Sequence, residues 1–103
     1  MSFNDGEIGA VIRVDAGEDI SSATSVLIKL QPEIGTEREF TATVPGVDVT
    51  VGDTTYSANE YAEYTTISED DLDYAGRWNK KVESTFSSTD IRQTNYRRFR
   101  VLP

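Results

Sequence analysis

The sequence predicts an all-β protein that folds as an antiparallel β-sandwich of seven to eight short strands. Three observations lead to this prediction. Apolar and polar residues alternate with a period of two in several short runs. Gly, Pro, Asp and Ser separate these runs about every eight to twelve residues, as turns do between strands. The chain of 103 residues is long enough for one buried core, so we expect residues 1–103 to form a single domain.

Three of the predicted strands carry their apolar side chains at even-numbered positions. They cover residues 8–14, 24–30 and 37–44. The apolar faces consist of Ile8, Ala10, Ile12 and Val14 in the first, Val26, Ile28 and Leu30 in the second, and Phe40, Ala42 and Val44 in the third. A turn that contains Pro32 and Gly35 separates the second from the third, which predicts that these two strands are antiparallel neighbours.

The middle of the chain predicts a small hairpin, one more strand and a short turn. Residues 47–51 and 54–57 flank a Gly-Asp pair that favours a tight hairpin turn. Residues 60–67 are rich in Tyr and Thr, which favour half-buried strands. Residues 68–72 predict one helical turn, with Ser68 as its N-cap and acidic side chains near its positive end.

The two longest predicted strands close the chain, at residues 77–86 and 91–101. In the first of them, Trp78, Val82 and Phe86 share one face. The last strand has an apolar face that consists of Ile91, Phe99 and Val101. Its other face carries a cationic and aromatic strip, Arg92, Tyr96, Arg98 and Arg100.

Two residue types that many active sites need are missing from the sequence, cysteine and histidine. Their absence removes disulfides, thiol nucleophiles, imidazole bases and the usual zinc, copper and haem ligands. We therefore expect no enzyme, no cofactor, no metal and no small-molecule substrate. The start of the chain shows no signal-peptide pattern, and no apolar run approaches about 20 residues. We expect the protein to be made and kept in the cytoplasm, or released by lysis, and to make no membrane contact.

The charge is divided unevenly along the sequence. Residues 1–73 contain 16 acidic and 3 basic side chains, whereas residues 74–103 contain 2 acidic and 7 basic ones. The two segments therefore carry net charges of −13 and +5, and the whole chain carries −8. An acidic chain repels phosphates, which disfavours nucleic acid as a partner. The division favours contacts between oppositely charged faces of neighbouring copies.

The strip in the last strand is the candidate protein interface, and it consists of Arg92, Tyr96, Arg98 and Arg100. Arginine suits interfaces because its planar guanidinium group forms paired hydrogen bonds with carboxylates. Two alternatives stay open for the same residues. They could form a solvated outer face whose charges limit edge-to-edge pairing of strands, or they could contact a nucleic-acid backbone and stack on bases.

Acidic and aromatic residues raise other kinds of site. The cluster of Glu69, Asp70, Asp71 and Asp73 could bind calcium, although a solvated turn explains it equally well. Paired carboxylates also occur in glycosidases, but among 18 acidic side chains some pair always lies at a suitable separation. Carbohydrate could stack on Tyr56, Tyr61, Tyr64 and Trp78, although we expect Trp78 in the core.

The segment before the strand at 77–86 contains an acidic residue, a glycine and an aromatic residue, namely Asp73, Gly76 and Trp78. Immunoglobulin-like sandwiches often have such a corner before a late strand. The glycine allows close backbone packing there, and the aromatic side chain turns inward. Trp78 stands where Tyr is usual, so its indole N–H needs a different acceptor. This pattern refines the predicted fold to an immunoglobulin-like sandwich.

Taken as a whole, the chain resembles the small immunoglobulin-like structural proteins of tailed bacteriophages, which form tail, baseplate and fibre-adaptor parts. The resemblance covers nearly all of the chain and is carried by residues 6–9, 19–24, 31–36, 73–78 and 99–101. One departure is the turn after Pro32, which is one residue longer than the usual Pro-Asp-Gly turn. That departure leaves the register of the hairpin open.

The resemblance implies a non-enzymatic structural protein of the virion that acts through protein–protein contacts. Its partners would be other virion structural proteins, with several copies of the chain in each particle. A capsid decoration, or cement, protein is the main alternative. A carbohydrate-binding module and an intracellular inhibitor whose acidic surface covers a basic partner are further alternatives.

Overall fold

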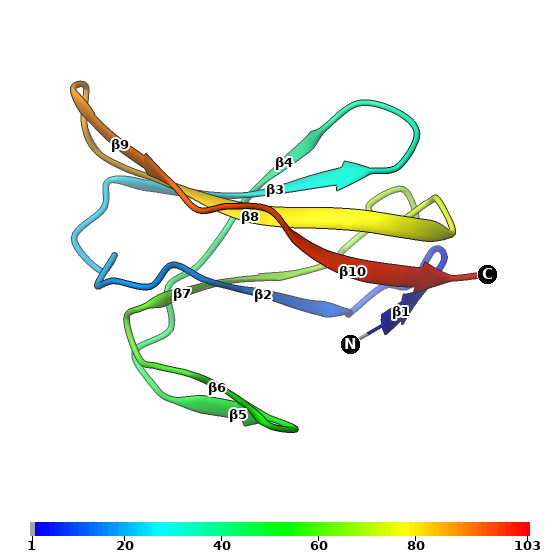
Figure 1. Ribbon diagram of the computed structural model, residues 1–103, viewed down its shortest axis with the longest axis horizontal. Coiled ribbons are helices and arrows are strands. Elements are labelled where there is room, and N and C mark those ends of the chain that lie inside the picture. The colour runs from blue at the N-terminus through cyan, green and yellow to red at the C-terminus, as the bar shows by residue number, and fades with distance from the viewer. Residues whose placement is uncertain (1) are drawn as a thin grey trace.

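The computed structural model describes residues 2–103, and within them it contains ten β-strands and no helix (Figure 1). The strands are β1 (Ser2–Asn4), β2 (Val11–Asp15), β3 (Ser25–Pro32), β4 (Arg38–Thr41), β5 (Val49–Val51), β6 (Thr54–Tyr56), β7 (Tyr61–Thr65), β8 (Gly76–Ser87), β9 (Asp90–Gln93) and β10 (Arg97–Leu102). The prediction of an all-β chain is therefore confirmed. These residues contain no helix that could cross a membrane.

The strands form one large sheet and two small ones. The large sheet has the order β1-β10-β8-β3-β4, and β9 pairs with the C-terminal half of β8. β1 runs parallel to β10, whereas the other neighbours in this sheet are antiparallel. β2 and β7 form a separate antiparallel pair, which packs against β8 and β3. Figure 1 shows the β5–β6 hairpin on the far side of that pair from the large sheet.

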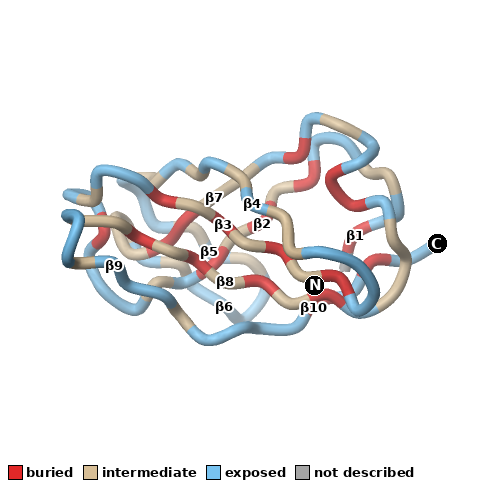
Figure 2. The backbone as a smooth tube through the Cα atoms, turned by 90° about the horizontal axis from the view of Figure 1, so that it is seen from above, coloured by how far each residue is buried: buried red, intermediate tan, exposed pale blue. Residues whose placement is uncertain are grey.

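The core lies between the large sheet and the β2–β7 pair. Alternate residues of the strands are buried there because successive side chains of a strand point to opposite faces. Figure 2 shows this alternation along β3 and β8. The buried residues include Ile12 and Val14 from β2, Val26, Ile28 and Leu30 from β3, Ala62 from β7, Trp78 and Val82 from β8, and Phe99 and Val101 from β10.

Several of the predicted elements are confirmed. β3 and β4 are antiparallel neighbours, and the predicted apolar residues of the third strand are half-buried beside exposed polar ones. β5 and β6 pair as a hairpin in which Val51 faces Thr54, so Gly52 and Asp53 form the turn. Gly52 has a φ of 61°, a conformation that glycine adopts at little cost. β7 occupies the predicted strand at 60–67.

The first predicted strand is wrong at its beginning. β2 starts at Val11, and Ile8 is 59% exposed rather than part of the core. The reason is Gly9, whose φ of 85° turns the backbone before the strand begins. At residues 68–72 the chain forms a hydrogen-bonded turn instead of a helix, in which the hydroxyl of Ser68 accepts a hydrogen bond from the backbone N–H of Asp70.

The last predicted strand is also wrong, because residues 91–101 form two strands. The backbone N–H of Thr94 donates to the carbonyl of Val82, while the Thr94 hydroxyl accepts from the N–H of Val82. A side chain thus replaces a backbone carbonyl in the ladder. Residues 94–96 face only two residues of β8, since Gln93 pairs with Glu83 and Arg97 pairs with Lys80. This β-bulge and the unpredicted β1 raise the number of strands above seven to eight.

The corner before β8 positions each of its three predicted residues. The carboxylate of Asp73 pairs with Arg38 at 2.6 Å. Gly76 has a φ of 139°, and a Cβ atom there would lie 3.0 Å from the ring of Tyr74. Trp78 is 1% exposed, and its indole N–H donates to the Tyr74 carbonyl at 2.8 Å. The backbone of Tyr74 is therefore the acceptor that the indole needs.

Replacement of Trp78 tests this corner. We expect Trp78→Ala to lower the free energy of unfolding by about 3–5 kcal/mol, because it leaves a large cavity in the core. Trp78→Phe should cost less, about 1–3 kcal/mol, because it keeps an aromatic ring but loses the hydrogen bond to Tyr74. Urea denaturation followed by circular dichroism measures both values. Equal stability of both variants and the wild type would contradict the proposed packing.

Candidate functional site

The positively charged side chains divide into two groups by their partners. Four of them have a carboxylate within 4.0 Å, namely Arg13, Lys29, Arg38 and Arg92. Among residues 2–103 the other cations have no such partner, and they are Arg77, Lys80 and Lys81 in β8 and Arg97, Arg98 and Arg100 in β10. The uncompensated positive charge of the described chain is therefore concentrated on two neighbouring strands.

The register of β8 and β10 brings like charges together. Arg100 lies directly opposite Arg77, and Arg97 lies directly opposite Lys80. Like charges at directly opposed positions of a sheet repel each other and lower its stability. The chain contains 18 acidic residues, yet none of them forms an ion pair with these four cations within the described residues. An anionic partner would relieve both repulsions.

Part of the predicted interface lies on the outer face of the large sheet. Arg98 and Arg100 are exposed in β10, and they alternate with the buried residues Phe99 and Val101. Arg77 in β8 is also exposed and lies opposite Arg100. We refer to Arg77, Arg98 and Arg100 as the outer basic surface.

The other two predicted residues have different surroundings. The hydroxyl of Tyr96 donates to the carboxylate of Glu37, and its ring lies 4.5 Å from the ammonium of Lys81. Arg92 pairs with Ser84, a buried residue, so the bulge turns it to the core-facing side of the sheet. There it forms ion pairs with Glu18 and Asp90. The expectation of one continuous strip is therefore wrong, because Arg92 lies apart from Arg98 and Arg100.

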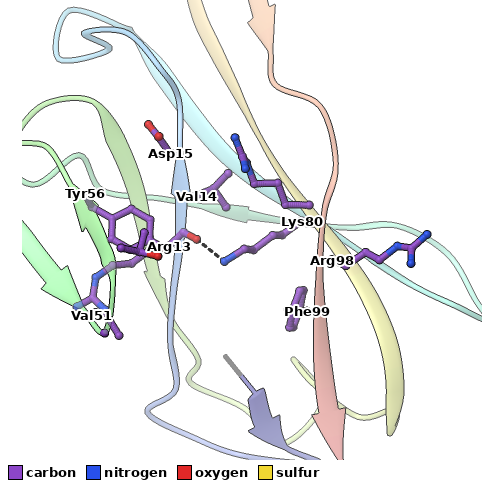
Figure 3. A pocket seen from close by; sticks show the side chains of 11 residues that line it. Arg13, Val14, Asp15, Val51, Tyr56, Lys80, Arg98 and Phe99 are labelled. Atoms are coloured by element: carbon purple, nitrogen blue, oxygen red, sulfur yellow. Dashed lines mark hydrogen bonds between the residues drawn. The ribbon is translucent and has the colours of Figure 1, made fainter.

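A groove of about 780 Å³ lies on the other side of β10. Its lining comes from β2, the β5–β6 hairpin, β8 and β10, and includes Arg13, Asp15, Tyr56, Lys80, Arg97 and Phe99. Figure 3 shows Lys80 reaching across the groove towards the backbone of Arg13, whereas Arg98 points away from it. Arg98 therefore also borders the groove, with its side chain directed away from it, whereas Arg77 and Arg100 do not line the groove.

Lys80 is the most unusual residue of this groove. Its side chain is 8% exposed, and its ammonium donates one hydrogen bond, of 2.6 Å, to the Arg13 carbonyl. Burial lowers the pKa of Lys80 to about 8, with smaller contributions from the charges of Arg97 and Arg13. Strongly shifted pKa values in clefts are typical of functional sites.

Sequence reasoning did not find Lys80, although the sequence contained a signal for it. The predicted core face of β8 included Trp78 and Val82, and strict alternation between them places residue 80 on the same face. A lysine at such a position needs a partner or an unusual environment. The prediction counted only the apolar members of that face.

The acidic cluster at residues 69–73 does not converge on one point. The carboxylate of Asp71 is buried, and it accepts hydrogen bonds from the Tyr64 hydroxyl at 2.7 Å and from the Ile67 N–H at 2.9 Å. Burial of Tyr64, together with its hydrogen bond to the Asp71 carboxylate, raises the pKa of Tyr64 to about 12. Asp73 pairs instead with Arg38. The described residues contain no group of three or more His, Cys, Asp or Glu that could hold a metal ion.

The four aromatic residues considered for carbohydrate do not form an exposed platform. Tyr61 and Trp78 are buried, and the Tyr61 hydroxyl donates to the Val47 carbonyl. Tyr64 stacks on Phe40, with ring centres 4.5 Å apart, and is half-buried. Tyr56 packs at 5.5 Å beside Tyr61. Tyr61, Tyr64 and Trp78 are therefore packed within the fold, and Tyr56 lines the groove as a single ring.

No protein-family model, no curated protein and no solved structure matches this chain. What β8 and β10 offer is positive charge and unused N–H donors, which suit carboxylate or phosphate oxygens.

The buried ammonium of Lys80 predicts a pH dependence of stability. Its pKa is about 8 in the folded chain and 10.5 as the ordinary value, so the unfolded state binds more protons between these values. Stability therefore rises with pH in this window. Relative to Lys80→Met, we expect the wild type to gain on the order of 2 kcal/mol between about pH 7 and about pH 10.

Urea denaturation of both proteins at each pH measures this gain. Other titrating groups are the same in the two chains, so their contributions cancel in the difference. A stability difference that stays constant across the window would show that Lys80 is not desolvated.

Removal of Asp71 tests its structural role against calcium binding. Asp71→Ala leaves the Tyr64 hydroxyl and the Ile67 N–H without their acceptor, and should cost about 2–3 kcal/mol in unfolding free energy. Asp70→Ala, at an exposed neighbour, should change it by no more than about 0.5 kcal/mol. Thermal denaturation with and without calcium should give the same melting temperature. A clear rise with calcium would revive the metal site.

Proposed function

We propose that this chain is a non-enzymatic binding domain of a bacteriophage particle, a component of the tail, baseplate or fibre attachment that acts through protein–protein contacts. The observation that carries the proposal is the concentration of unpaired cations on β8 and β10. The chain has a net charge of −8, yet within residues 2–103 these cations have no acidic partner. A binding partner with carboxylates on its surface would pair with these cations.

The fold in this proposal is an immunoglobulin-like sandwich. In such sandwiches the last strand, the strand before it and an early strand share one sheet, and a second sheet packs on its inner face. The order β10-β8-β3-β4, with β2 and β7 packed against it, supports this assignment. The corner at Asp73, Gly76 and Trp78 supports it as well, since it precedes the strand that lies beside the last one.

The outer basic surface supports a protein partner. Arg77 and Arg98 line one shallow hollow together with Glu33 and Asn79, and Arg100 lies beside Arg77 across the strands. Exposed guanidinium groups form paired hydrogen bonds with carboxylates, which favours an acidic protein surface. Another copy of this chain offers such a surface, since residues 1–73 carry a net charge of −13. The acidic chain as a whole disfavours nucleic acid.

The virion location is supported by the resemblance in the sequence and by the same surface. A particle component must bind its neighbours repeatedly and specifically, and electrostatic complementarity supplies both specificity and rapid association. Particles purified from a lysate of cells that carry the gene should contain the chain in several copies, as mass spectrometry measures. Its absence from such particles would overturn the virion assignment.

Charge reversal tests the outer basic surface. Arg98→Glu combined with Arg100→Glu should weaken binding to the particle roughly tenfold or more, because it replaces attraction by repulsion. Arg92→Glu is the matched control, since Arg92 is also exposed but lies on the other side of the sheet. Co-sedimentation of the purified chain with particles, at low and high salt, measures both effects. Binding that is the same in the double variant as in the wild type, and the same at low and high salt, would contradict the proposed surface.

A further inference from the structure

Two strand edges without a partner border the groove beside Lys80. Among residues 2–103, β2 pairs with β7 alone. The carbonyl of Arg13 accepts a hydrogen bond from Lys80 in β8, which shows that it faces away from β7. β10 pairs with β8 along one edge, whereas β1 covers its other edge only at Arg100–Leu102. Residues 97–99 therefore present an open edge. Within the described residues no other strand fills the space.

Open strand edges are binding sites for extended peptide. Their free N–H and C=O groups can form the same ladder that joins strands inside a sheet. In an extended strand the N–H and C=O of one residue point to the same side, so the N–H of Arg13 also faces the groove. A peptide beside β2 would reach the backbone of both Arg13 and Asp15.

The positive charges beside these edges favour a peptide that carries negative charge. The ammonium of Lys80 has three donors, and within residues 2–103 only the Arg13 carbonyl accepts from it. Arg97 lies opposite Lys80 and has no acidic partner in the described chain. Arg13 differs from both, because its guanidinium Nε lies 3.0 Å from a carboxylate oxygen of Glu63 and forms an ion pair with it. A carboxylate placed between Lys80 and Arg97 would satisfy the free donors and remove the repulsion.

We propose that this groove binds an extended acidic segment of a partner protein, which adds a strand to the edge of β2 and places a carboxylate on Lys80 and Arg97. The inference rests on the proposed function in that the partner is a protein. It does not require the partner to be part of a virion. The Arg98 side chain of the outer basic surface points away from this site (Figure 3), and Arg77 and Arg100 do not line the groove.

Binding exchanges one set of hydrogen bonds for another. In the free chain Lys80 covers the Arg13 carbonyl, and an inward-pointing charge of this kind protects an edge against self-association. The incoming peptide donates a backbone N–H to that carbonyl. The ammonium then turns to the carboxylate of the peptide. The acidic side chain is therefore required to open the edge, which makes the site selective for acidic sequences.

The test uses the full chain and short capped peptides of alternating Glu and Thr residues. Isothermal titration calorimetry should show binding of this peptide, and binding weaker by about tenfold or more for the matched Gln-Thr peptide. Lys80→Met and Arg97→Gln should each weaken binding of the Glu-Thr peptide by a similar factor. Arg97 is exposed, so its variant keeps the test valid if Lys80→Met unfolds. Arg100→Gln, in the same strand but outside the groove lining, is the control and should change binding by less than about twofold.

Each other outcome overturns the inference in a distinct way. Equal binding of the Glu-Thr and Gln-Thr peptides would exclude a role for the carboxylate. Glutarate that binds as tightly as the peptide would identify a small-anion site without strand addition. Loss of binding in Arg100→Gln but not in Lys80→Met would move the peptide to the outer basic surface. These results leave the particle experiments unaffected, so failure here and failure of the proposed function can be distinguished.

Discussion

The position of β8, which is paired along both of its edges, is the constraint on which the rest of the structure depends. It pairs with β3 along one edge and with β10 and β9 in succession along the other, so it joins every part of the large sheet except its outer edges. Its alternate residues must face the core, because β2 and β7 pack against that side. Trp78 and Val82 meet this requirement with apolar side chains. Lys80 meets it only by reaching the carbonyl of Arg13.

The same strand holds opposed positive charges at a cost in stability. Opposed cations on β8 and β10 cost the sheet a fraction of its stability, roughly 1 kcal/mol or less for each pair. Burial of a large side chain such as Trp78 contributes several times more. The sheet can therefore hold repelling charges in fixed positions. A partner that supplies carboxylates gains from charges whose repulsion has already been overcome in folding.

Most of the strands could be predicted from the sequence, but the positions at which strands are interrupted could not. β3, β4 and the β5–β6 hairpin follow from alternation and from turn residues, which are local signals. β1 could not be predicted in this way, because its three residues are held by a partner about a hundred residues away. The bulge at Thr94 depends on a hydroxyl that replaces a backbone carbonyl. The alternation of apolar and polar residues does not predict such a replacement. That one extra residue moved Arg92 to the other side of the sheet.

The parallel pairing of β1 with β10 determines how the domain responds to a pulling force. Ser2–Asn4 lies beside Arg100–Leu102, with both segments running in the same direction. Tension applied between residue 2 and residue 102 pulls the two strands along their length in opposite senses. Their hydrogen bonds are then loaded together in shear, rather than opened one after another as in a zipper. The parallel pair would therefore resist such tension with all of its hydrogen bonds at once.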